Sequence, residues 1–309
     1  MSAQPQISST STNSDDRQRV LGLERLVRGL HLQNNIASVV LALGTLIGAL
    51  VFLLILIYLL INGVPYLLNP DFYGSNGTGT VGQQIFNTLY ILIFTEIILV
   101  PITLSAAIYL VEYAPQGPFV TVIHFAAETL AGVPSLVLGL FGYLVFSTVL
   151  GFGLSRLSGV LTLLCLNFPI ALRLFEDALT TVAREQREGG LALGSTKWHM
   201  IRTVVLPSAV PGIITGIVLS AGKIIAEAAA IIFTMGASNG ANVYTLNPMI
   251  STDNLTIHIY YLQTSGVVPQ NVANAVSAGS AALLIIILLV INLGSRSVGR
   301  LIQRKIMAA

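Results

Sequence analysis

Charged side chains are scarce in this chain. Asp, Glu, Lys and Arg make up 9% of its 309 residues, whereas they supply about a quarter of a typical soluble domain. Hydrophobic residues reach 54%, and the mean hydropathy is +0.82. This composition excludes a soluble globular protein and a basic surface for nucleic acid. It predicts a membrane protein with several spanning segments.

Cysteines and clustered metal ligands are also lacking. The single cysteine, Cys165, excludes an intrachain disulfide. The four histidines, His31, His124, His199 and His258, are scattered along the chain, so no metal centre is expected. No nucleophile stands beside a base, and no glycine-rich loop has the spacing of a nucleotide site. We therefore expect no catalytic residue, no cofactor and no enzymatic activity.

Long apolar runs are what the chain does contain. A membrane-spanning helix needs about 20 mainly apolar residues, and six segments meet this requirement. We therefore predict an all-α membrane protein with six transmembrane helices. The predicted spans are 36–62, 85–111, 131–150, 157–175, 209–235 and 272–294.

The two ends of the chain are expected to lie outside this spanning domain of residues 36–295. Residues 1–35 form a polar tail in which arginines alternate with apolar residues over 17–31. That pattern fits an amphipathic helix on the membrane surface or, equally, a solvated basic tail. Residues 296–309 form a second basic tail.

The positions of Lys and Arg predict the orientation in the membrane. They occur in the N-terminal segment, in the loop 176–207 and in the C-terminal tail, whereas the loops 63–84 and 236–270 contain none. Cytoplasmic loops are enriched in Lys and Arg, so both termini and the central loop are predicted to be cytoplasmic. Arg156, in a short turn on the other side, is the one exception.

The central loop contains the longest polar interruption, residues 184–207. Good helix formers fill Thr181–Leu193, and Gly194 is suited to ending that helix. Ser195 is then expected to cap a second helix, and Pro207 to end it or to begin the next span. The sequence therefore predicts two short helices with a bend at Gly194.

Two charged residues, Lys223 and Glu227, fall inside the fifth predicted span. Lys223 lies about 20 Å along that helix at 1.5 Å per residue, near the bilayer midplane. A lone charge there is costly, but residues four apart share one helix face and can pair. The pair either fixes helix packing or lines a transport path. Glu96 and Glu128 are expected near a membrane surface, in structural roles.

The spacing in the central loop resembles the EAA loop of bacterial ABC-importer permeases. That motif has Glu-Ala-Ala, three residues, Gly, nine residues and Ile-x-Leu-Pro. The matching residues here are Glu188, Gly189, Gly190, Gly194, Val204, Leu206 and Pro207. The departures are Gly-Gly for Ala-Ala and Val for Ile. The segments 107–115 (AIYLVEYAP), 130–142 (LAGVPSLVLGLFG) and 258–263 (HIYYLQ) further resemble the phosphate-specific, PstA-type branch.

The resemblance implies a type I ABC importer permease in the bacterial cytoplasmic membrane. Such a subunit is a non-catalytic half of a channel for inorganic phosphate. It pairs with a second homologous permease subunit and receives phosphate from an extracytoplasmic binding protein. Two copies of a cytoplasmic ATPase would dock on the loop 180–207. The family usually has Arg where Lys223 stands, which puts the grip on phosphate in doubt, since Arg binds phosphate through two bonds and Lys does not.

Three alternatives remain open from the sequence. The first is a permease for another oxyanion, such as molybdate or sulfate. The second is a secondary transporter that works without an ATPase, although no inverted repeat is apparent. The third is a membrane sensor that reports phosphate status through the central loop.

Overall fold

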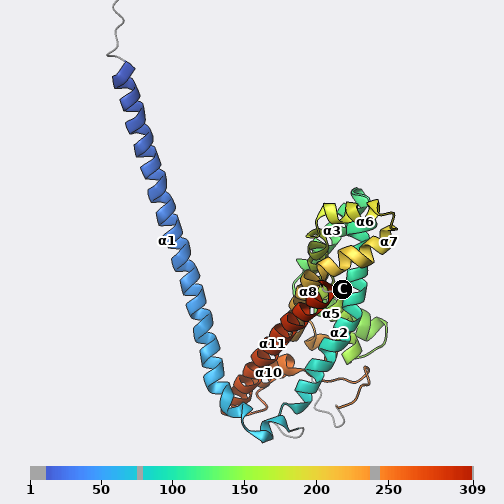
Figure 1. Ribbon diagram of the computed structural model, residues 1–309. Coiled ribbons are helices and arrows are strands. Elements are labelled where there is room, and N and C mark those ends of the chain that lie inside the picture. Colours follow the sequence, from blue (N-terminus) through green and yellow to red (C-terminus); the bar gives the residue numbers. More distant parts are fainter. Residues whose placement is uncertain (1–11, 75–78, 237–243, 308–309) are drawn as a thin grey trace, which may run out of the picture. The chain divides into compact units, whose positions relative to one another are not determined.

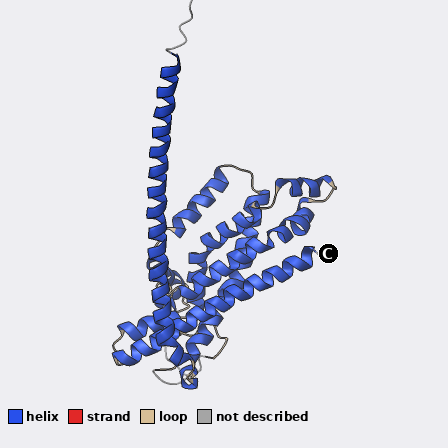
Figure 2. Ribbon diagram, turned by 60° about the vertical axis from the view of Figure 1, so that its left-hand side comes forward, coloured by secondary structure: helices blue, strands red, loops and turns tan. Residues whose placement is uncertain are grey.

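The structure is a computed structural model of the 309-residue chain, and it describes residues 12–74, 79–236 and 244–307. Side chains are described from residue 33 onward, except those of 296, 298 and 300–307. Every regular element within these ranges is helical (Figure 2), as the sequence predicts. The elements are α1 (Thr12–Leu67), η1 (Pro70–Tyr73), α2 (Gly82–Ile108), η2 (Tyr109–Tyr113), α3 (Pro118–Ala131), α4 (Ser135–Gly142), η3 (Tyr143–Val149), α5 (Arg156–Thr180), α6 (Arg184–Ala192), α7 (Lys197–Met200), η4 (Ile201–Val205), α8 (Leu206–Ala226), α9 (Ile232–Met235), α10 (Leu255–Thr264) and α11 (Gln270–Met307).

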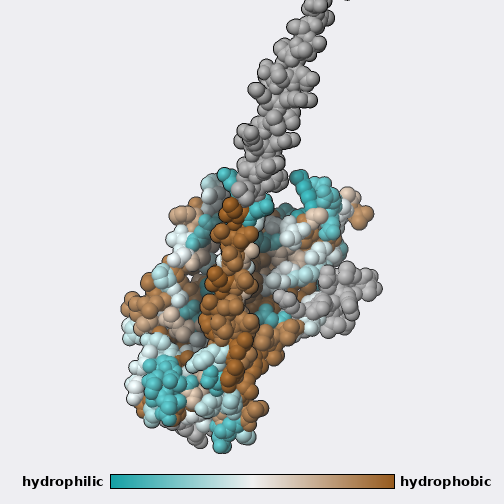
Figure 3. Space-filling model, turned by 90° about the vertical axis from the view of Figure 1, so that its left-hand side faces the viewer, coloured by the Kyte–Doolittle hydropathy of each residue, from teal (hydrophilic) through white to brown (hydrophobic). Residues whose placement is uncertain are grey.

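Residues 1–58 form one structural unit and residues 59–309 another. Helix α1 runs without a break from Thr12 to Leu67, so one helix stands where a surface segment and a span were predicted separately. Over 33–67 its apolar side chains are largely exposed (Figure 3). A helix that is apolar on all sides and exposed to this extent suits a lipid environment.

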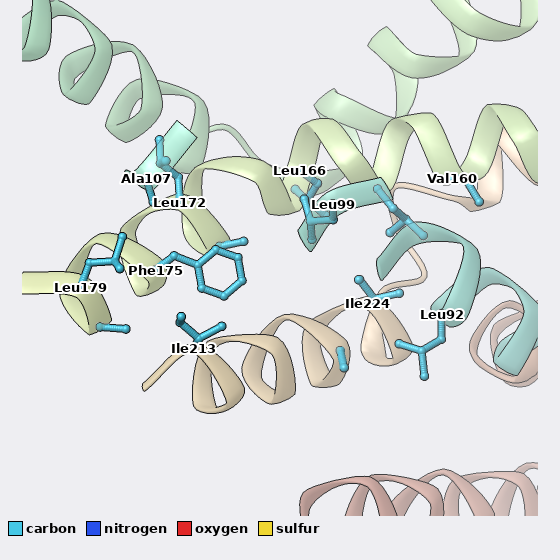
Figure 4. Close-up of a cluster of buried hydrophobic side chains, with 14 of the residues drawn as sticks. Leu92, Leu99, Ala107, Val160, Leu166, Leu172, Phe175, Leu179, Ile213 and Ile224 are labelled. Atoms are coloured by element: carbon cyan, nitrogen blue, oxygen red, sulfur yellow. The ribbon is translucent and has the colours of Figure 1, made fainter. Parts of the chain in front are cut away.

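The core of the second unit is built by α2, α5 and α8, which pack directly against one another, with α11 against α8. Figure 4 shows their apolar side chains meeting, among them Leu99 from α2, Phe175 from α5 and Ile224 from α8. Small residues bring the helices together, because a Cβ on Gly212 would lie 2.6 Å from that of Ala178. These three helices form the rigid frame that positions the remaining segments.

The third predicted span, 131–150, corresponds to α4–η3, and a sharp bend separates it from the helix before it. Helices α3 and α4–η3 meet at an angle of 99°, across the break at residues 132–134. Pro134 cannot continue a helix from the preceding turn, since it has no backbone N–H. The apolar segment after this break is the one that the sequence predicts as a span.

Five helical segments in the described ranges are long and apolar enough to cross a membrane, and the bent pair makes a sixth. The prediction of six spans agrees with this arrangement. The fifth span differs from its predicted extent of 209–235, since its helix ends at Ala226. Figure 1 shows α6 and α7 at one end of the bundle and α10 toward the other.

Candidate functional site

The central loop forms two short helices separated by a glycine, as predicted. Helix α6 covers Arg184–Ala192, and Gly194 follows with φ +81°. A left-handed backbone of this kind favours glycine, because a Cβ would crowd the following carbonyl. The expected cap at Ser195 is wrong. Thr196 caps α7 by accepting a bond from His199 N, and Ser195 Oγ donates to Gly190 O at 2.7 Å.

Pro207 lies at the start of α8, but the preceding helix does not end there. The chain stays helical from Lys197 through Ala226, with a wide π turn at Ile201–Val205. Proline lacks the N–H that would bond to the preceding turn, and the π turn lies directly before it, a rare feature inside α-helices that is frequent at functional sites. Leu206 and Pro207 therefore begin α8 without interrupting the helix that starts in the loop at Lys197.

The two glycines of the Glu188-Gly189-Gly190 motif have different surroundings. A Cβ on Gly189 would meet nothing within 4 Å, whereas one on Gly190 would lie 2.9 Å from Met200 Cγ. Met200 is 1% exposed, so Gly190 lets α6 pack closely against the segment that begins with α7. Only the second glycine is required by packing.

Arg187 holds α6 to the helices beneath it. Its Nε donates to Oε1 of Glu112 at 2.9 Å, and its two terminal nitrogens donate to the carbonyls of Leu179 and Val182, both at 2.7 Å. Leu179 is near the end of α5, where helix carbonyls lack intrahelical partners. Glu112 is nearly buried, with a side chain 5% exposed. The pair ties the loop to the ends of both α2–η2 and α5.

Three large apolar side chains of the loop are exposed among its charged ones. Leu193 at the bend is 90% exposed, Trp198 56% and Leu191 44%. Glu188 is exposed beside them and pairs with Arg184 at 2.8 Å. The sequence analysis did not identify Leu193 as a site residue, although a leucine directly before the helix-ending glycine was visible there. Large exposed apolar residues at a tip are typical of an interaction surface.

Lys223 and Glu227 are not arranged as predicted. Helix α8 ends at Ala226, and Glu227 has an extended backbone with φ −75° and ψ 125°, so the two residues do not share one helix face. Glu227 Oε1 instead accepts a bond from Ala230 N at 3.0 Å. Among the described side chains, no ion pair within 4.0 Å joins Lys223 to Glu227. Both belong to a break in the fifth span.

Small residues surround this break. A Cβ on Gly139 of α4 would lie 2.6 Å from the carbonyl oxygen of Ala230, so the small residues here let α4 approach the backbone of the alanine-rich segment closely. In membrane proteins, discontinuous helices expose backbone groups where they line a path rather than face lipid.

Glu96, which is expected near a membrane surface, is not at an end of its helix. It lies near the middle of the apolar helical segment Gly82–Tyr113, and Ser220 Oγ of α8 is 2.6 Å from its Oε1. Glu128 lies on α3 and pairs with Arg173 of α5 at 3.2 Å, and both side chains are exposed. A second pair between the same helices joins His124 and Glu176 at 3.1 Å. The two pairs between α3 and α5 were not predicted, because each joins residues about 50 positions apart in the sequence.

Arg156 is fully buried, which explains why it did not follow the charge pattern of the loops. It donates to Asn87 Oδ1 at 2.5 Å and to the carbonyls of Thr245 and Asn247. Its guanidinium lies 4.7 Å from the ring centroid of Tyr90. Asn87 in turn donates to Thr252 and to the carbonyl of Asp253, whose carboxylate contacts Gln84 and His258. This network fixes the segment 244–254 to α2 and α5.

Comparison with known proteins identifies the family. The family described as the binding-protein-dependent transport system inner membrane component matches residues 100–308. The chain is 36% identical over 266 residues to the probable ABC transporter permease protein YqgI of Bacillus subtilis, covering 81% of this chain and 90% of that protein. It is 34% identical to the phosphate transport system permease protein PstA 1 of Mycobacterium tuberculosis, covering 70% and 69% of the two chains. The chain therefore belongs to this family of ABC transporter permeases.

Solved structures agree on the fold. The chain matches the MetNI methionine ABC transporter in an inward-facing conformation with a TM-score of 0.57 and 17% identity, covering 72% of this chain and 95% of that chain. It matches a bacterial transporter that imports alginate with a TM-score of 0.61 and 16% identity, covering 86% and 99%. The fold is that of a type I ABC importer permease.

Family membership defines the protein's place in a transporter. The chain is a non-catalytic inner-membrane component that works with a partner permease and a separate ATPase subunit. A transporter that works without an ATPase is therefore set aside. Within the described residues, no group of three or more His, Cys, Asp or Glu is arranged to hold a metal.

Proposed function

We propose that the chain is the membrane-spanning subunit of an importer for inorganic phosphate. The support comes from relatives named as phosphate transport system permeases, including PstA 1 of Mycobacterium tuberculosis and PstA of Yersinia pestis. The loop geometry is consistent with this role. An exposed apolar tip on a buried Arg187–Glu112 anchor can transmit a push from an ATPase to α2, α5 and α8.

The ATPase docks on the loop 180–207 in this proposal. Glu188 and Leu193 face outward, while Gly190 and Arg187 hold the loop from below. The left-handed Gly194 sets the angle between α6 and α7. Leu206 and Pro207 then connect the loop directly to α8. Beyond the bend at Gly194, helical backbone is continuous from Lys197 to Ala226, so a force on the loop would reach the last turn of α8, which carries Lys223.

The anion passes the break in the fifth span. Lys223 lies in the last turn of α8, where the partial negative charge of the helix end favours a cation. Glu227 holds its own backbone turn through Ala230, so it restrains the break and partly balances Lys223. A lysine attracts an anion as a point charge, without the two-bond grip of arginine.

The arrangement in the membrane follows from the loops. We place both termini and the loop 180–207 in the cytoplasm, where the basic residues gather. The buried network around Arg156 is then at the extracytoplasmic end, where a phosphate-binding protein delivers its ligand. The partner permease completes the channel, because one helical bundle of this kind encloses half of a path.

Uptake of labelled phosphate by vesicles holding the complete transporter tests the substrate. Phosphate uptake that needs ATP and is not displaced by molybdate or sulfate supports the proposal. Uptake of one of those oxyanions in place of phosphate would contradict it. Neutralising the cation with Lys223→Gln should abolish uptake, whereas Lys223→Arg should preserve it. Unaltered uptake by Glu227→Gln would leave Glu227 a packing role only.

Co-purification of the ATPase tests the docking surface. Leu193→Asp and Glu188→Lys should both abolish it and stop uptake, because each places a wrong charge on the exposed surface. Leu68→Asp is the matched control, since Leu68 is 79% exposed and lies outside the loop. Retention of the ATPase by Leu193→Asp would show that it docks elsewhere.

A further inference from the structure

Glu96 has no role in the transport scheme described so far, yet it is a carboxyl group inside a membrane-spanning helix. It lies near the middle of the segment Gly82–Tyr113, on the side of α2 that meets α8. Insertion scales give an acidic residue at the centre of such a helix a large unfavourable cost. The contacts of its two oxygens show how the chain meets this cost.

The contacts of Ser220 indicate whether Glu96 carries a proton. Ser220 Oγ lies 2.6 Å from Oε1 of Glu96 and 2.9 Å from the carbonyl oxygen of Ile217. A hydroxyl has one hydrogen to donate, so it cannot donate to both oxygens. If Glu96 is an acid, its O–H donates to Ser220 and Ser220 donates to Ile217, and both short contacts are hydrogen bonds.

The second oxygen of Glu96 points to the same protonation state. Oε2 is buried and has no hydrogen-bond partner, and no ion pair joins Glu96 to a cation among the described side chains. An ionised carboxylate would leave much of its charge unsolvated in an apolar surrounding, which is very costly. A neutral acid leaves only one carbonyl oxygen unpaired.

We propose that Glu96 is a proton-binding site at the junction of α2 and α8, and that its bound proton keeps negative charge away from the anion path. Ser220, which contacts Glu96, lies three residues before Lys223 on α8, about one helical turn, so Glu96 meets the same helix that carries the cation. With Glu96 neutral, Lys223 and Glu227 sum to zero charge. With Glu96 ionised, the three residues sum to −1 and repel an anion.

The other charged groups on the elements packed against α2 are already engaged or distant along their helices. On α5, Arg156 is buried in the network with Asn87, and Arg173 and Glu176 are paired with residues of α3. On α10, His258 is paired with Asp253. The titratable groups on these elements are Arg156, Cys165, Arg173, Glu176 and Asp177 of α5, Lys223 of α8, Tyr109, Glu112 and Tyr113 of η2, and His258, Tyr260 and Tyr261 of α10, and Glu112 is paired with Arg187.

Infrared spectroscopy of the purified transporter in lipid tests the proton directly, whatever the substrate. The difference between wild type and Glu96→Gln should contain the C=O band of a carboxylic acid at neutral pH. Glu185→Gln is the matched control, because Glu185 is exposed and its loss should remove no such band. If Glu96→Gln removes only carboxylate bands, Glu96 is ionised and the proposal is wrong.

A second variant serves if Glu96→Gln does not fold. Ser220→Ala keeps the acid but removes the oxygen to which it donates. Its carboxylic acid band should move to the position of an acid without a hydrogen bond. An unmoved band would contradict the contact between Glu96 and Ser220 and overturn the proposal.

The effect on the anion rests on the function proposed above and is measured by phosphate uptake at rising external pH. Glu96→Gln should match wild type at neutral pH. The ratio of its uptake to that of wild type should then rise by up to about tenfold per pH unit once wild-type Glu96 loses its proton. A constant ratio would refute the role in charge control. Absence of wild-type phosphate uptake at every pH would count against the phosphate proposal instead, and the infrared result would still decide the proton.

Discussion

Arg187 and Arg156 hold irregular segments at opposite ends of α5, in different surroundings. Arg187 lies beneath an exposed surface, where it binds Glu112 and the carbonyls that end α5. Arg156 is wholly buried and binds neutral oxygens of Asn87, Thr245 and Asn247. The first arginine leaves the apolar side chain of Leu193 exposed at the tip of the loop, and the second holds its segment through contacts inside the protein.

This difference separates a surface built for a partner from a segment that is fixed in place. A loop that must transmit force needs an exposed contact and a firm base, and Arg187 supplies the base through a charged pair. The segment 244–254 makes its contacts inside the protein, through buried side chains such as Thr252 and Asp253. Three substitutions, ordered by expected effect, test this contrast.

The largest loss is expected at Arg156. Arg156→Leu leaves the buried Oδ1 of Asn87 and two partly buried carbonyls without their donor. An unsatisfied buried acceptor costs about 1–3 kcal/mol and a partly buried one less, so we expect a loss of roughly 3–5 kcal/mol in all. Thermal unfolding of the purified protein in detergent measures it. Arg202→Leu, at an exposed position, is the control and should change little. A loss below about 1 kcal/mol for Arg156→Leu would mean that these oxygens find other donors, and that the arginine is not needed to hold the segment.

A smaller loss is expected at Arg187. Arg187→Leu leaves Glu112 nearly buried and unpaired, which should cost about 2–4 kcal/mol, since removing one member of a buried pair is strongly destabilising and this pair is partly exposed. Adding Glu112→Gln should recover part of that loss. Arg184→Leu is matched on the same helix, because its pair with Glu188 is exposed and is worth at most about 1 kcal/mol. Equal losses for the two arginines would remove the distinction between base and surface.

The smallest effects are expected at the glycines of the loop. Gly194→Ala forces a left-handed alanine and should cost about 1–2 kcal/mol. Gly189→Ala has open space and should stabilise α6 by up to about 1 kcal/mol, because alanine is the better helix former. The free energy of unfolding should therefore fall for Gly194→Ala and rise for Gly189→Ala, and the amount of ATPase that co-purifies should change in the same directions. A gain for Gly194→Ala would contradict the bend.

Much of the architecture could be predicted because the bilayer constrains a sequence strongly. Six apolar segments long enough to span a bilayer, and a basic loop between two of them, were visible in the order of apolar and charged residues. The two helices around Gly194 followed from helix formers and a glycine. The cap was assigned to Ser195 instead of Thr196, since both residues can accept the same bond and only the local geometry distinguishes them.

The site residues divide in the same way. The spacing from Glu188 to Pro207 was sufficient to find the loop. The break at Glu227 was not predicted, because an alanine-rich apolar run reads as a continuous helix, and it ends where the backbone of α4 approaches at Gly139. The position of Glu96 was missed for a related reason. A carboxyl inside a span becomes tolerable only through a partner from another helix, Ser220.

The sequence by itself determined the number of spans, the class of protein and the location of the loop, because hydropathy, charge and glycine spacing act over a few neighbouring residues. Only the tertiary structure decided which charges are enclosed and which are exposed. Arg156 and Arg202 are the same residue type, yet one is buried among carbonyls and the other is exposed. That outcome depends on oxygens supplied by distant segments, and no local pattern records them.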